Sequence, residues 1–216
     1  MKKFLITAVI TSLIGGAALA QTNVVSSANV VGYNQITIPS NQYVLVSLGF
    51  DVADNTISNL FGSLPVGSSA YLWDTQTQAY KSFTKATRGG WNAFGTNRIT
   101  AGTGAFAKLP ANIATNIYFS GDVPTAGTSI IYQVNGYALV AYPYPVDMAF
   151  TNTTLAKNSS IGDSISIWSN GWTVYTKATR GGWGAGSNAV LKVGQAFFYK
   201  STNTASRGEI KPYTIN

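Results

Sequence analysis

Short apolar runs, rich in β-branched and aromatic residues, recur along this chain of 216 residues, and polar stretches with Gly, Pro, Asn or Ser separate them. Such runs predict strands of about four to eight residues. In the first half of the chain they are Tyr43 to Leu48, Ser69 to Trp73, Tyr80 to Thr84, Gly104 to Leu109 and Asn116 to Ser120. Their spacing of about 8 to 12 residues predicts an all-β fold, sandwich-like or barrel-like in each half of the chain.

Two of the connections predict β-hairpins. The dipeptide Asn135-Gly136 lies between the runs Ser129 to Val134 and Tyr137 to Tyr142. This dipeptide accepts the positive φ angles of a type I′ turn. Alignment of the two halves predicts a matching hairpin from Gln35 to Ile38 and Tyr43 to Leu48.

One stretch has the period of a helix instead. After Asn55, a candidate N-cap, the apolar residues Ile57, Leu60, Phe61 and Leu64 fall at i, i+3, i+4 and i+7. The corresponding stretch of the second half is more polar. We therefore expect at most one short helix in each half.

The heptapeptide Lys-Ala-Thr-Arg-Gly-Gly-Trp occurs twice, at Lys85 to Trp91 and at Lys177 to Trp183. Further matches at similar offsets pair Trp73 with Trp168. Insertions of a few residues fall between the matched blocks, as expected where loops connect repeated units. The sequence thus predicts that one β unit is used twice.

The repeat predicts two tandem homologous β modules, residues 34–123 and 124–216, preceded by an extended segment or strand at residues 21–33. The linker between them, residues 121–127, contains Pro124 and is short enough for the modules to touch. One hairpin tip is longer in the first module, at residues 75–78, than in the second.

Residues 1–20 have the pattern of a cleaved export signal. Two lysines precede an apolar run from Phe4 to Ile14, and Ala18-Leu19-Ala20 provides a small-residue cleavage site. We expect an exported protein that is extracellular or on the cell surface of a bacterium, with the periplasm as the alternative. No membrane span is expected after cleavage.

The formal net charge of +7 falls to +5 when the two lysines of the signal leave with it. Only 10% of the residues are charged, and no cluster of Lys or Arg occurs. Because phosphate backbones are bound by clustered cations, nucleic acid is not an expected partner. Weak attraction to anionic polysaccharide remains compatible with the charge.

The chain contains neither histidine nor cysteine. This excludes Ser-His-Asp and Cys-His catalysis, zinc fingers and iron–sulfur clusters. Asp51 and Asp54 are the acids that lie close together in sequence, and they lack the spacing of a calcium loop. We therefore predict a protein without enzymatic activity, without a cofactor and without a metal site.

The segment Ser27 to Tyr33 (SANVVGY) precedes two copies of a Tyr-x-Leu-Val block, a strand that ends in Trp and a Gly-x-x-x-Phe strand. This arrangement resembles a group of poorly characterised secreted bacterial proteins with paired β modules. Residues 136–145 (GYALVAYPYP) are also similar to the GWNLIGNPYPS-type β-domain of secreted and surface proteins, although Ala141 stands where that domain usually has Gly. The resemblance implies a surface or accessory role and carries no catalytic residue across.

Two hypotheses about function follow. The first is a structural protein of the cell surface or extracellular matrix that associates with itself by β-strand addition. Its candidate assembly strand comprises Val24, Val25, Val30, Val31 and Tyr33. An ordinary edge strand paired within the chain is the alternative for this segment.

The second hypothesis is a carbohydrate-binding module that contacts cell-surface polysaccharide through the repeated heptapeptide. Its candidate contact residues are Lys85, Arg88, Trp91, Lys177, Arg180 and Trp183. Indole faces stack on sugar rings and cations hold hydroxyl or acidic groups. The competing interpretation is that both tryptophans fill the core and the Gly-Gly pairs only allow a sharp bend.

Overall fold

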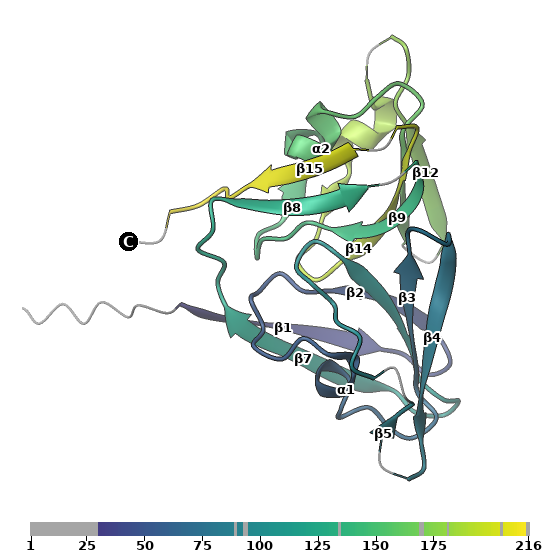
Figure 1. Ribbon diagram of the computed structural model, residues 1–216. Coiled ribbons are helices and arrows are strands. Elements are labelled where there is room, and N and C mark those ends of the chain that lie inside the picture. The colour runs from purple at the N-terminus through teal and green to yellow at the C-terminus, as the bar shows by residue number, and fades with distance from the viewer. Residues whose placement is uncertain are drawn as a thin grey trace, which may run out of the picture.

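The computed structural model describes residues 30–214, apart from residues 89, 93, 94, 134, 169, 170, 181 and 204. For residues 128–133 and 205–207 it describes the backbone alone. The expected export signal, Val24 and Val25 lie outside the described residues. The regular elements of the described chain are antiparallel strands and short helical segments, which confirms the all-β class (Figure 1).

In the first half the elements are β1 (Val31–Ile38), β2 (Tyr43–Ser47), α1 (Ile57–Leu60), β3 (Ser69–Asp74), β4 (Ala79–Ala86), β5 (Gly90–Trp91), β6 (Gly104–Lys108) and β7 (Thr115–Asp122). In the second half they are β8 (Thr128–Gln133), β9 (Gly136–Ala141), β10 (Met148–Ala149), η1 (Phe150–Asn152), α2 (Thr154–Lys157), β11 (Ser164–Trp168), β12 (Trp172–Thr176), η2 (Gly184–Asn188), β13 (Val190–Leu191), β14 (Ala196–Ser201) and β15 (Ala205–Ile210).

The described parts of the two halves share one pairing scheme. A large sheet has the order β2-β6-β3-β4-β5 in the first half and β9-β14-β11-β12 in the second. The pairs β1–β7 and β8–β15 also correspond. Register agrees as well, because Tyr43 pairs with Lys108 and Tyr137 with Lys200. The repeat in the sequence therefore coincides with a repeat in topology.

The hairpin with its tip at residues 75–78 is confirmed by the pairing of β3 with β4, whereas the hairpins predicted around residues 39–42 and 135–136 are wrong. Strand β1 pairs with β7 and strand β8 with β15, while β2 and β9 join the large sheets. In the first half the connection crosses from one layer to the other, because β1 and β2 both carry apolar side chains that face the same core. Gly136 has φ 126 and begins β9, and a Cβ there would lie 2.7 Å from Oε1 of Gln78. Asn135-Gly136 is therefore a corner between layers that also contacts the other half.

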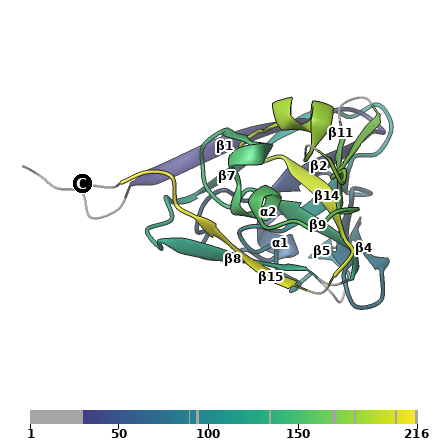
Figure 2. The same ribbon diagram turned by 90° about the horizontal axis from the view of Figure 1, so that it is seen from above.

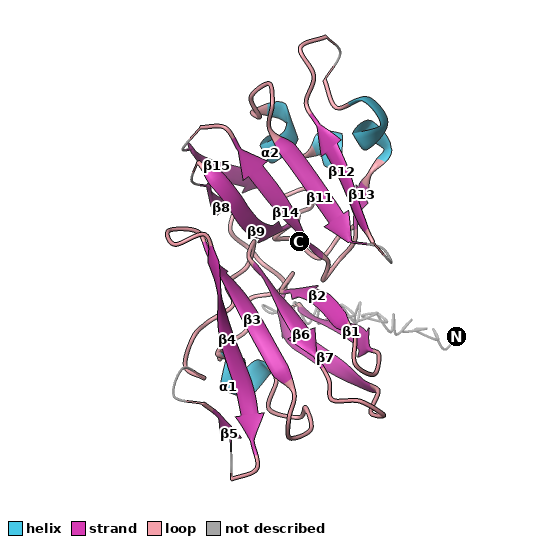
Figure 3. Cartoon of the chain, turned by 90° about the vertical axis from the view of Figure 1, so that its right-hand side faces the viewer, coloured by secondary structure: helices cyan, strands magenta, loops and turns pink. Residues whose placement is uncertain are grey.

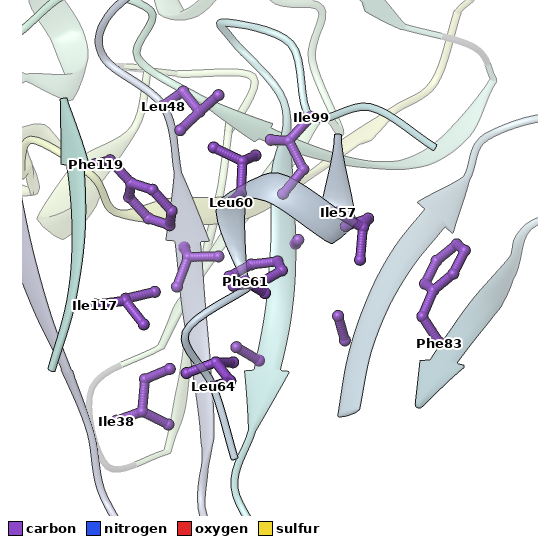
Figure 4. Packing of buried hydrophobic residues seen from close by; sticks show 14 of the residues in the cluster. Ile38, Leu48, Ile57, Leu60, Phe61, Leu64, Phe83, Ile99, Ile117 and Phe119 are labelled. Carbon is purple, nitrogen blue, oxygen red and sulfur yellow. The ribbon is translucent and has the colours of Figure 1, made fainter. Parts of the chain in front are cut away.

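The core of the first half lies between the large sheet and a second layer made of β1, β7 and α1 (Figure 4). The four apolar residues predicted to share a helix face are all buried in it: Ile57, Leu60, Phe61 and Leu64. Thr56, rather than Asn55, is the N-cap, and its Oγ1 accepts a hydrogen bond from the amide of Asn59 at 3.3 Å. The predicted helix is confirmed, with its cap shifted by one residue.

The corresponding stretch of the second half folds as η1 followed by α2. Thr153 is the N-cap of α2 and accepts a hydrogen bond from the amide of Ala156 at 3.1 Å. Glu209 on β15 accepts hydrogen bonds from the next two amides, those of Thr154 at 2.9 Å and Leu155 at 2.7 Å. A polar sequence forms this helical turn because side-chain oxygens satisfy its first amides.

The halves contact each other through the outer faces of their large sheets. The amide of Ser47 donates to the carbonyl of Gly194 at 3.0 Å, and the amide of Ala141 donates to the carbonyl of Gly102 at 2.9 Å. These two bonds are reciprocal, because Ser47 corresponds to Ala141 and Gly102 to Gly194 in the shared register. Reciprocal contacts of this kind are the mark of a twofold interface, here within one chain.

The longer hairpin tip of the first half departs from this symmetry. The side chain of Gln78 donates to the carbonyl of Tyr137 at 2.9 Å and accepts from its amide at 2.8 Å. Nε1 of Trp73 donates to the same carbonyl at 2.8 Å. The longer tip of the first half thus forms hydrogen bonds with strand β9 of the second half.

The connection between the halves is shorter than expected, because residues 121 and 122 belong to β7. The start of β1 and the chain after β15 lie on the same side of the molecule, and β3, β4 and β12 lie on the other (Figures 1 and 2). No helix of the described residues is both long and apolar enough to cross a membrane.

Candidate functional site

Both faces of the large sheet in the first half carry apolar side chains. Along β3, Ala70 and Leu72 face the core of the half, and the alternating residues Tyr71 and Trp73 face the second half. This follows from the two-residue period of a strand. In Figure 3 the two large sheets lie one above the other.

These outward-facing aromatic side chains form what we call the aromatic groove. Its members are Tyr43, Tyr71, Trp73, Tyr80, Phe106, Tyr137, Trp168, Trp172 and Phe198. Phe106 and Phe198 are buried at its centre, with ring centroids 6.3 Å apart. They occupy corresponding positions of β6 and β14, so the approximate twofold relation passes between them.

The groove contains two hollows. The first, of about 280 Å³, is lined by Tyr43, Tyr71, Tyr80, Phe106, Trp168 and Trp172. The second, of about 440 Å³, is lined by Trp73, Tyr80, Tyr137, Ser166, Trp172, Val174 and Phe198. Tyr80 and Trp172 line both hollows and correspond to each other in the shared register. The hollows are thus counterparts, and Ser166 in place of Tyr71 leaves more room in the second.

Edge-to-face contacts hold the rings of the groove in place. Tyr80 meets Phe198 at 6.4 Å and 77°, and its counterpart Trp172 meets Phe106 at 6.4 Å and 76°. Such pairs stabilise a fixed ring orientation by about 0.5–1.5 kcal/mol beyond the area they bury. The described side chains of the groove therefore form a preorganised surface.

Four rings of the groove remain accessible to a ligand. Tyr43, Tyr80, Tyr137 and Trp172 are 46%, 45%, 41% and 43% exposed. Burial raises the pKa of the Tyr80 hydroxyl, and burial together with a hydrogen bond to Tyr43 raises that of Tyr71. These hydroxyls stay protonated at neutral pH and can both donate and accept hydrogen bonds.

A lysine lies beside each hollow. Nζ of Lys108 is 4.8 Å from the ring centroid of Tyr43, and Nζ of Lys200 is 5.5 Å from that of Tyr137. The two lysines and the two tyrosines are counterparts in register. The groove thus has an ammonium group next to each of its hollows.

In both halves the chain folds back across the repeated heptapeptide, with Ala86 paired to Gly90 and Ala178 bridged to Gly182. Gly90 and Gly182 have φ 154 and φ 77, which favour glycine. The two copies lie at opposite ends of the molecule (Figures 1 and 3). The six candidate contact residues of the heptapeptide are therefore not brought together.

The lysines of the heptapeptide make contacts within their own halves. Nζ of Lys85 donates to the carbonyls of Gly62 at 2.6 Å and Leu64 at 2.7 Å. Nζ of Lys177 donates to the carbonyl of Ser159 at 2.7 Å. In both halves the ammonium thus satisfies carbonyls that follow the short helix.

The tryptophans of the heptapeptide pack inward. Trp183 is 6% exposed and its ring centroid lies 4.7 Å from that of Phe150. Trp91 is half-buried and lies 6.0 Å from Phe61. Arg88 and Arg180 are exposed at the turns. The two tryptophans of the repeat therefore do not form a platform of exposed, coplanar indole rings.

The candidate assembly strand is partly described. Residues 31–38 form β1, which pairs along its whole length with β7 of the same chain. Val31 and Tyr33 point to solvent and are 67% and 77% exposed, while Val30 precedes the strand. The described part of the segment is thus a strand paired within the chain that carries an exposed apolar face.

Among the described residues, no group of three or more acids is placed to hold a metal ion. Burial and the nearby Asp122 raise the pKa of Asp51, whereas a hydrogen bond from Thr56 lowers that of Asp54. The two acids therefore lie in different environments, despite their proximity in sequence.

Sequence reasoning missed the groove. It used Trp73 and Trp168 as markers of alignment, and it did not single out the aligned pair Tyr80 and Trp172. The available signal was the run Tyr71-Leu72-Trp73, which makes both faces of one strand apolar. A sheet with two apolar faces needs a second partner, and the other half of the chain is that partner.

Comparison with family models, with curated proteins and with solved structures found no match to this chain. The resemblances stated from sequence therefore stay predictions.

Proposed function

We propose that the protein is an exported, non-enzymatic carbohydrate-binding protein and that the aromatic groove is its binding site. The observation that carries this proposal is the set of four half-exposed rings around two hollows, Tyr43, Tyr80, Tyr137 and Trp172. Large contiguous apolar patches on a protein surface commonly mark interaction sites or ligand-binding grooves.

A sugar ring suits this surface better than an apolar chain does. Pyranose rings present C–H groups on their faces and hydroxyls around their edges. The groove offers aromatic faces inside and tyrosine hydroxyls beside them, and a few placed polar groups in an apolar hollow are typical of small-molecule sites. The fixed rings lower the entropy lost on binding.

Binding without hydrolysis fits the residues of the groove. Among the described residues, those that line the hollows include no carboxylate. Glycosidases ordinarily need two carboxyl groups that face each other across the scissile bond. The groove is therefore proposed to hold a saccharide and not to cleave it.

The test is the variant Trp172→Ala, because Trp172 lines both hollows. We expect its affinity for glycans that bind the wild type to fall at least about tenfold, since aromatic anchors carry much of an interface's binding energy. A glycan array followed by calorimetry measures this, and circular dichroism checks that the variant folds.

Tyr118→Ala is the matched control, because Tyr118 is an exposed aromatic residue on β7, outside the groove. It should bind as the wild type does. Glycan binding that survives Trp172→Ala unchanged, or a folded wild type that binds no glycan, would rule the proposal out.

A self-associating structural protein is the second candidate. The face of β1 and β7 that carries Val31, Tyr33 and Tyr118 favours it, because these side chains are 67%, 77% and 63% exposed. The double variant Tyr33→Ser/Tyr118→Ser should then have a lower mass by light scattering than the wild type has. A wild type that stays monomeric at every concentration excludes this candidate.

A further inference from the structure

We propose that the ligand of the aromatic groove is an acidic polysaccharide, one whose sugars carry carboxylate or sulfate groups. This inference rests on the proposed function and narrows it from carbohydrate to anionic carbohydrate. The groups assigned to the acid are the ammonium groups of Lys108 and Lys200.

The two lysines have corresponding places in the groove. Lys108 pairs across the sheet with Tyr43, which lines the first hollow, and Lys200 with Tyr137, which lines the second. Each ammonium lies over the ring of its paired tyrosine, at 4.8 Å and 5.5 Å. The face of an aromatic ring attracts a cation, which biases each ammonium toward the hollow that its tyrosine lines.

Neither ammonium has an acidic partner in the described part of the chain. The salt bridges there join Lys81 to Asp74 and Lys192 to Asp147, both at 2.6 Å. Lys108 and Lys200 are therefore free to pair with an acid on a ligand. Hydrogen bonds to charged groups are the stronger ones.

The charge of these lysines decides between two ligand classes that aromatic hollows accept. Aromatic cages also bind quaternary ammonium groups. A cationic ligand here would meet a lysine ammonium beside either hollow, and like charges repel. The formal net charge of +5, expected once the signal with its two lysines has left, also favours an anion.

The arrangement further points to a polymer. Tyr80 and Trp172 line both hollows, so the hollows adjoin, and each has its own lysine. One chain that crosses both hollows would place an acidic group near each lysine. An acidic polysaccharide meets this condition with its repeating units.

The experiment compares polygalacturonate, dextran sulfate and neutral dextran as ligands of the mature protein. We expect the wild type to bind at least one acidic polymer more tightly than dextran, with an affinity that falls as salt rises. Binding to polygalacturonate alone identifies a carboxylate ligand, and binding to dextran sulfate alone identifies a sulfate ligand.

Lys108→Gln/Lys200→Gln should weaken binding of the preferred acidic polymer about tenfold and flatten its salt dependence. The matched control is Arg88→Gln/Arg180→Gln, which removes the same charge from two exposed turns at the ends of the molecule. The control should bind nearly as the wild type does.

Equal losses in the two double variants would overturn the inference, because net charge alone would then explain binding. Tight binding of dextran, unaffected by the lysine variant, would overturn it and leave the proposed function intact. Displacement of the polymer by choline chloride beyond the effect of equal sodium chloride would also overturn it. Loss of polymer binding in Trp172→Ala would show that the polymer binds in the groove. Unchanged binding in that variant would overturn the proposed function itself.

Discussion

At the scale of single residues, the carboxylate of Asp163 organises a buried polar cluster in the second half. It accepts hydrogen bonds from the amides of Ser160 and Thr202, both at 2.8 Å, and from the hydroxyl of Tyr199 at 2.5 Å. The hydroxyl of Thr202 donates to it as well, at 2.8 Å. A buried carboxylate with this many donors is fully satisfied.

Replacing this carboxylate should destabilise the fold. Asp163→Ala leaves several buried donors without an acceptor, and we expect a loss of about 3 kcal/mol in the free energy of unfolding. Urea denaturation measures it. Asp147→Ala, which removes an exposed partner of Lys192, should cost less than about 1 kcal/mol. Equal losses in the two variants would contradict the role given to Asp163.

The same carboxylate predicts a dependence on pH. Burial alone would raise the pKa of Asp163, but the hydrogen bonds from Tyr199, Thr202 and Ser160 outweigh it and lower the pKa below its ordinary 3.8. The ionised carboxylate of Asp163 therefore stabilises the folded state fully above the ordinary pKa of 3.8. This stabilisation is lost as the pH falls through the lowered pKa of the folded state. Asp163→Ala should show less loss of stability over this acidic range.

At the scale of elements, the strands and the short helix could be predicted from sequence, and their partners could not. Alternation and turn residues are local signals, and they located strands such as β3 and β6 within about two residues. The pairing of β1 with β7 joins segments far apart in the chain. The turn signal at Asn135-Gly136 was overridden because β8 pairs with β15 and β9 with β14, so the two strands belong to different sheets.

The longer hairpin tip of the first half shows a second limit. Its length could be read from the alignment of the two repeats. Its contact with Tyr137 could not, because Gln78 adopts φ 53 and reaches a residue of the other half. Such a contact depends on how the halves are placed, which local patterns do not encode.

At the scale of the whole molecule, close packing between the large sheets shapes the groove. Gly104 of β6 and Ala196 of β14 are counterparts that meet at the interface. A Cβ on Gly104 would overlap that of Ala196 and come within 3.2 Å of Cγ of Leu139. One of the two positions must therefore lack a side chain.

This asymmetry predicts a rescue. Gly104→Ala should lower stability by about 2 kcal/mol through overpacking, seen as a fall in Tm of about 4 to 8 °C. Adding Ala196→Gly moves the methyl group to the opposite sheet and should restore more than half of that loss. Thermal denaturation of the single and double variants measures both. A double variant less stable than Gly104→Ala would contradict this packing.

The candidate site was hidden from sequence for a related reason. The identical sequence of its two copies drew attention to the heptapeptide. Its lysines and tryptophans make contacts within each half. The groove instead uses aligned positions that differ, such as Tyr80 and Trp172 or Tyr71 and Ser166. The proposed function depends on residues from both large sheets, so these residues form a site only once the two halves have packed together.

The chain enters at β1 and leaves after β15 on one side of the molecule, while β3, β4 and β12 lie on the other. A copy anchored by either end would hold its groove outward. Many such copies on one surface would grip a long polymer at several points at once, and the resulting avidity could exceed the affinity of one groove by about 10²–10⁴. Individually weak, quickly reversible contacts would then suffice to retain the polymer.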